Sequence, residues 1–96
     1  MTNSEAILRL SVNKRDRLAM LSLHDNNLEI IRAALARYFE THSAADKCVP
    51  LLMLRIADQA RLYEHSENPD AWLANCANTQ CDRLRHEAIR EKAYTG

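Results

Sequence analysis

The chain has 96 residues, of which 47% are hydrophobic, and its 13 basic and 13 acidic side chains leave a formal net charge of zero. This size and composition fit one globular domain, while a single glycine and two prolines are too few for the turns of a β-rich fold. No run of about 18 apolar residues occurs, so a membrane span is excluded, and residues 1–10 lack the apolar segment of a secretory signal.

The N-terminal quarter is predicted to form two short helices, at about Ser4–Val12 and Lys14–His24. The polar cluster at residues 24–27 is predicted to be a turn or a helix cap, because Asp and Asn favour turns and satisfy free N–H groups at helix starts. We therefore expect a single domain in which residues 1–27 form short N-terminal helices and residues 28–92 form the core helices.

An amphipathic helix is predicted at Leu28–Glu40, where apolar residues recur every three or four positions. The next helical segment is expected to begin near Ser43, and Pro50 lies inside it. Proline lacks a backbone N–H and crowds the preceding turn of a helix. A kink or a fresh helix start is therefore expected at Pro50.

The segment after Pro50 is apolar on more than one side. One broad stripe is expected to face the core, and it consists of Val49, Leu52, Met53, Ile56, Ala57, Ala60 and Tyr63. Leu51, Leu54 and Leu62 lie on a different side, among charged residues. Such a helix is either central in its domain or partly covered by another chain, so a homodimer is one possible arrangement.

The last helix has the clearest start signal in the chain. In Asn68-Pro69-Asp70, asparagine suits the N-cap, proline the first helical position and aspartate the first turn. The helix is expected to run to about Lys92, with an inner face of Trp72, Leu73, Cys76, Ala77, Leu84 and Ala88. The predicted fold class is all-α: a compact bundle of four to five helices with a long C-terminal helix, in orthogonal or helix-turn-helix-like packing.

No catalytic, metal or cofactor site is predicted. Cys76, Cys81 and His86 are five residues apart on one helix, so successive side chains differ by about 140° and cannot converge on one ion. With Cys48 the cysteines number three, which indicates reduced thiols in a cytoplasmic protein. No serine or cysteine is paired with an oriented histidine, and no glycine-rich phosphate loop is present. We therefore expect no enzyme.

The polar side of the last helix is the candidate binding surface. Asn and Arg side chains can read base edges, and Arg or Lys can bind phosphates. The candidate nucleic-acid-binding residues are Asn75, Asn78, Arg83, Arg85, His86, Arg90 and Lys92. The alternative is a solvated helix, with Asp82 pairing within it and C-terminal cations that complement its dipole. Zero net charge is also unusual for a dedicated nucleic-acid binder.

The segment Asn68–Arg85, NPDAWLANCANTQCDRLR, resembles the second conserved region of extracytoplasmic-function sigma factors. That family shows an alanine-tryptophan-leucine after a proline, and Asn78, Asp82 and Arg85 match its polar positions. Upstream, Ala44-Ala45-Asp46 is similar to its Ala-Glu-Asp segment. The sequence departs from the family pattern in two places: the spacing from tryptophan to asparagine is one residue shorter, and Val49-Pro50 replaces a Gln-Glu pair.

The resemblance implies a helical domain that binds RNA polymerase and helps to open and read promoter DNA. It also implies that the loop at residues 64–68 approaches the separated strand, where Tyr63 is a candidate for stacking on a base. The expected partners are single-stranded or promoter-like DNA and RNA polymerase. The alternative is a non-enzymatic protein-interaction module, which could be a homodimer.

Overall fold

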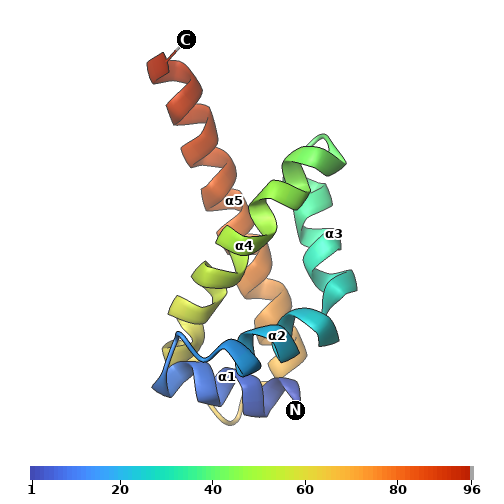
Figure 1. The fold of residues 1–96 in the computed structure, drawn as a ribbon, viewed down its shortest axis with the longest axis vertical. Helices are drawn as coiled ribbons and strands as arrows, with labels where there is room; N and C mark the ends of the chain where they lie inside the picture. The colour runs from blue at the N-terminus through green and yellow to red at the C-terminus, as the bar shows by residue number, and fades with distance from the viewer. Residues whose placement is uncertain (96) are drawn as a thin grey trace.

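The computed structural model describes the backbone of residues 1–95 and the side chains of residues 1–91. The described backbone forms five α-helices and one 3-10 turn, without a strand (Figure 1). The elements are α1 (Asn3–Val12), α2 (Arg17–Asn26), α3 (Leu28–Tyr38), α4 (His42–Gln59), η1 (Ala60–Leu62) and α5 (Pro69–Thr95). The predicted all-α class with a long C-terminal helix is confirmed.

Helices α1, α3 and α4 pack against α5, whereas α2 contacts α1, α3 and α4. In Figure 1, α1 and α2 lie crosswise at the lower ends of α4 and α5, while the C-terminal end of α5 extends beyond the other helices. This projection makes the molecule elongated, with extents of 43 × 23 × 23 Å. All side chains from Arg85 to Glu91 are exposed, so α5 adds no buried residue to the core between Leu84 and Glu91.

One hydrophobic core joins all five helices. The stripe predicted after Pro50 is confirmed: six of its seven residues are buried, and Val49 packs against the core at its edge. The N-terminal helix α1 also enters this core, since Ala6 and Ile7 are 0% exposed and Leu10 is 2% exposed. The core therefore extends beyond the expected range of residues 28–92. Each fully buried Ile or Leu contributes roughly 1.5–3 kcal/mol.

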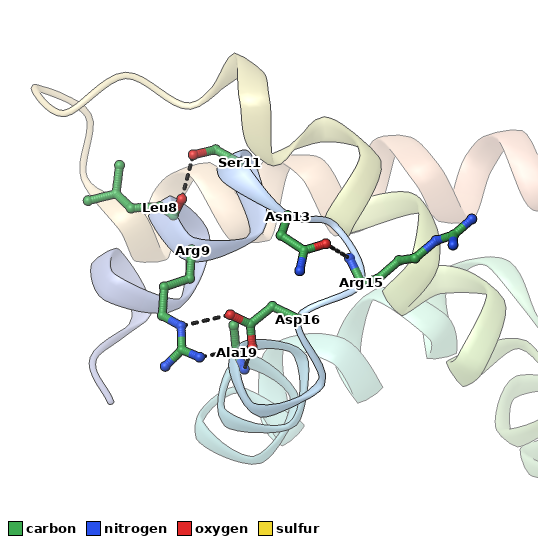
Figure 2. A network of polar contacts seen from close by, with 7 residues as sticks. All are labelled: Leu8, Arg9, Ser11, Asn13, Arg15, Asp16 and Ala19. Carbon is green, nitrogen blue, oxygen red and sulfur yellow. Dashed lines mark hydrogen bonds and ion pairs between the residues drawn. The ribbon is translucent and has the colours of Figure 1, made fainter.

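The first corner of the chain is held by Asp16 (Figure 2). Its carboxylate accepts a hydrogen bond from the backbone N–H of Ala19 at 3.1 Å, and so caps α2. The Arg9 guanidinium donates to the same carboxylate at 2.8 and 3.1 Å. The Ala19 hydrogen bond, with Arg9 second, holds the pKa of Asp16 below its ordinary value. This cap makes α2 begin at Arg17, not at Lys14 as the sequence suggested.

The turn or cap expected at residues 24–27 is a helix junction, in which Asn27 is the N-cap residue of α3. α2 continues to Asn26, and only Asn27 separates it from α3. The buried Asn27 side chain exchanges hydrogen bonds with Asn3 at 2.8 and 2.9 Å and donates to the carbonyl of Leu23 at 2.7 Å. Asn3 also donates to Asp70 at 2.7 Å. These bonds connect α1, the α2–α3 junction and the first turn of α5.

The helix α4 passes through Pro50 without interruption, so the fresh start expected there is wrong. The helix begins after Thr41, whose hydroxyl accepts from the N–H of Ala44 at 3.1 Å. Pro50 lies on the exposed side of α4, while the adjacent Leu52 and Met53 are buried. Burial of the apolar side keeps the segment helical despite the hydrogen bond that proline cannot donate.

Among the described residues, no helix combines the length and the apolar character needed to cross a lipid bilayer.

Candidate nucleic-acid interface

The start of α5 has the capping geometry that its sequence predicts. Asn68 Oδ1 accepts hydrogen bonds from the N–H groups of Asp70 and Ala71 at 2.9 and 3.1 Å. Just before it, the Tyr63 hydroxyl donates to the carbonyl of Glu67 at 3.0 Å, and its ring meets Trp72 edge-to-face with centroids 5.6 Å apart. Tyr63 is 8% exposed. It therefore packs the core and cannot stack on a base without leaving it.

The buried side of α5 ends earlier than the sequence suggests and includes two unexpected residues. Leu73, Ala77 and Leu84 are buried as expected, and Trp72 and Cys76 are partly buried. Ala88 is exposed, because α5 has left the body by that point. Two residues outside the expected inner face, Gln80 and Cys81, are buried at 4% and 0% exposure. On a helical projection Gln80 lies about 20° and Cys81 about 80° from Leu73, so the direction of both is compatible with the inner face.

The structure separates the seven candidate residues into different environments. Five are exposed: Asn75, Arg83, Arg85, His86 and Arg90. Asn78 is partly buried, and Lys92 lies beyond the residues whose side chains the structure describes. The candidates therefore do not form one common face.

Asn78 belongs to the packed part of α5, which corrects its assignment to the outer side. Its Nδ2 donates to the carbonyl of Ala74 at 2.9 Å, a local bond one turn back along the helix. Its Oδ1 is buried and has no hydrogen-bond partner among the described residues. Because a helical residue is only 100° from its neighbour, Asn78 lies at the edge of the side that includes Ala77 and Cys81.

Four of the exposed candidates form a row along one side of α5, called here the α5 row: Asn75, Arg83, His86 and Arg90. At 100° per residue, they lie within about 80° of one another. Arg85 points about 120° away from the middle of this row. The backbone carbonyl of Asp82 can only accept, so its 2.8 Å contact makes His86 Nδ1 the donor and leaves Nε2 facing away from that bond.

Within residues 1–91, no carboxylate lies close enough to neutralise the arginines near the end of α5. Among the described side chains, Arg83, Arg85 and Arg90 have no acidic group within 4.0 Å. The carboxylate of Glu87, which could balance them, forms an ion pair with Arg55 of α4. Residues 83–92 contain four arginines or lysines and two glutamates. A locally basic segment thus exists on a chain with zero net charge.

A groove of about 430 Å³ runs beside the α5 row. Asn75 and Arg83 of the row line it, together with Trp72, Cys76 and Thr79 from the same helix. Its opposite wall comes from Gln59 and Leu62 and from the loop before α5. Gln59 and Leu62 lie at least 10 positions before Trp72, outside α5, so no motif in α5 could have revealed that they line the groove.

The cysteines and His86 do not come together as ligands. Cys81 faces the core, Cys76 lines the groove and His86 is exposed. No group of three His, Cys, Asp or Glu side chains suited to a metal ion occurs within the described part of the chain. Burial raises the pKa of the Cys76 and Cys81 thiols to about 11, so both are protonated at neutral pH.

Comparisons with protein-family models, with curated proteins and with solved structures found no match to this chain. The likeness to sigma factors thus consists of the motif residues alone. Of the three polar positions that match, Arg85 is exposed, whereas Asn78 and Asp82 are partly buried.

Proposed function

We propose that this protein is a nucleic-acid-binding, transcription-associated helical domain that contacts DNA through the α5 row. The observation that supports this most directly is the pair Arg83 and Arg90. Both are exposed on the same side of α5, and neither has a carboxylate within 4.0 Å among the described side chains. Unpaired arginines on one helix side are suited to polyanions.

The spacing of the two arginines fits one nucleic-acid strand. They are two helical turns apart, which is about 10 Å along the axis. Phosphates on one strand follow one another every 3.4 Å or so along a duplex, so the two guanidinium groups can contact phosphates about three nucleotides apart. Asn75 and His86 of the same row supply hydrogen-bonding groups of the kind that contact base edges.

The sigma-factor resemblance of Asn68–Arg85 supports a role in transcription, with RNA polymerase as a second partner. That role would place the protein in the cytoplasm. The preferred DNA is then single-stranded or promoter-like, since a helix that carries arginines along one side can follow one separated strand without entering a groove.

Fluorescence anisotropy with a labelled single strand and a labelled promoter-like duplex tests the proposal. Affinity should fall steeply between low and moderate salt. The variant with Arg83→Ala and Arg90→Ala should bind about tenfold more weakly, and its salt slope on the single strand should be smaller by about 1.4, because two phosphate contacts are lost.

A matched control removes two other exposed arginines, Arg32 and Arg37 of α3, and should leave both affinity and slope unchanged. Wild-type affinity in the Arg83/Arg90 variant would exclude the α5 row as the interface. If only Arg85→Ala lost affinity for DNA, the contact would lie on the other side of α5.

A further inference from the structure

The exposed side of α4 carries a short repeat that the core does not use. Lys47, Leu51, Leu54 and Asp58 follow one another at spacings of four, three and four residues. This is the heptad spacing that places side chains on one seam between paired helices. We call these four residues the α4 stripe.

The two leucines of the α4 stripe are open to solvent. Leu51 is 48% exposed and Leu54 is 56% exposed, and they lie one turn apart. Leu62 continues the apolar surface beyond Asp58 with 61% exposure. Single exposed leucines are common on protein surfaces. Adjacent leucines on one helix side with a charged residue at each end are typical of a helix–helix seam.

We infer that the chain forms a homodimer in which two copies of α4 pair antiparallel through the α4 stripe. In an antiparallel pair related by a twofold axis, the sequence numbers of two residues that face each other add up to the same value at every contact. If Leu51 faces Leu54 of the second copy, then Leu54 faces Leu51 and the four leucines form the centre. The same register places Lys47 opposite Asp58 of the second copy at both ends.

The charges distinguish this arrangement from the parallel one. A parallel twofold pair would place each Lys47 against Lys47 and each Asp58 against Asp58, which is repulsive. The antiparallel pair converts both contacts into attractions. The stripe is therefore complementary to itself in one direction only, and this charge complementarity identifies a second copy as its occupant.

The charged residues of the stripe are available for such contacts. Among the described side chains, Lys47 has no carboxylate within 4.0 Å. Asp58 pairs with Lys14 at 3.2 Å, but both side chains are more than half exposed. An exposed pair of this kind is weak, so Asp58 can turn to the second copy or be shared between two lysines.

The interface is small, because one helix from each copy supplies it. It belongs to the class below about 1,200 Å² of total buried area, which is typical of weak and transient association. A dissociation constant in the micromolar range is therefore expected. This dimer is independent of the α5 row, whose residues do not take part in it.

Sedimentation velocity of the full chain, from low micromolar to near millimolar concentration, tests the inference. The wild type should shift from monomer to dimer over this range. Leu54→Asp should weaken the dimer at least tenfold, because it places a carboxylate in the leucine centre. The control Leu18→Asp, at a 66% exposed leucine of α2, should dimerise as the wild type does.

A charge exchange tests the register. Lys47→Asp and Asp58→Lys should each weaken the dimer about fivefold, since each creates two like-charge contacts. The double variant should recover the wild-type affinity, because it restores both pairs with exchanged signs. All three substituted positions in the stripe are exposed, and far-UV circular dichroism will show that the fold is retained.

A wild type that stays monomeric up to near millimolar concentration would overturn the inference. So would a dimer that Leu54→Asp does not weaken. A double exchange that fails to recover affinity would overturn the antiparallel register. DNA binding by the Leu54→Asp monomer should be retained, so a failure of the dimer is distinguishable from a failure of the α5 row.

Discussion

Replacing Pro50 with alanine should stabilise the fold by about 2 kcal/mol. Pro50 lies in the interior of α4, which continues from His42 to Gln59. It has no N–H for the carbonyl of Asp46 one turn earlier, and its ring crowds that carbonyl. Alanine supplies the donor and removes the crowding. Because Pro50 is exposed, the smaller side chain leaves no cavity in the core.

The magnitude comes from two opposing terms. Proline in a helix interior is less favourable than alanine by about 3 kcal/mol. Proline also restricts the unfolded chain, so the substitution loses about 0.4–1 kcal/mol through the greater entropy of the unfolded state. The difference is about 2 kcal/mol, which corresponds to a rise of roughly 8–16 °C in Tm for a domain of this size.

Urea unfolding followed by far-UV circular dichroism measures the change as a higher midpoint with an unchanged slope. Pro69→Ala is the matched control. Pro69 is the first residue of α5, where a free N–H is unsatisfied in any case, so this variant should change stability by less than about 1 kcal/mol. An unchanged or lower midpoint for Pro50→Ala would refute the reasoning. It would mean that packing requires the backbone geometry that proline imposes at this point of α4.

Two further measurements examine α5. Asn78→Leu should raise stability by about 1 kcal/mol in urea unfolding, because it removes a buried Oδ1 that has no partner among the described residues. The affinity for DNA should not change. A loss of affinity without a loss of stability would show that Asn78 contacts DNA. For Cys81, burial raises the thiol pKa from 9.0 to about 11. As pH rises, the thiol therefore ionises in the unfolded chain before it ionises in the folded protein. The free energy of unfolding should be unaffected by this thiol below pH 9 and should fall by about 2–3 kcal/mol as the pH rises to 11. Urea unfolding of Cys81→Ala at several pH values should lack this fall. If the free energy of unfolding fell equally with pH in the wild type and the variant, the prediction would be wrong.

Local features of the sequence were sufficient to predict the helices. The capping residue Asn68 and the first helical residue Pro69 act within one turn, so the start of α5 is correct. Periodicity acts over a few turns, and it identified the buried stripe from Leu52 to Tyr63. One error comes from a contact distant in sequence: the bonds of Asn27 to Asn3 hold the junction at which α3 follows α2 almost directly. The other is local, because the Asp16 side chain caps α2 through the N–H of Ala19, so this helix begins at Arg17.

For the candidate site, the residue types and the basic character of the last helix could be read from the sequence, because charge and helical spacing are properties of α5 alone. The tertiary structure decided which of those side chains reach solvent on the same side. Burial depends on where α3 and α4 cover α5, and this cover ends near Leu84. It therefore buries Cys81, partly buries Asn78 and leaves Arg83 and Arg90 exposed in one row. Spacing along a helix gives the direction of a side chain, and only the packing of neighbouring helices determines what lies in that direction.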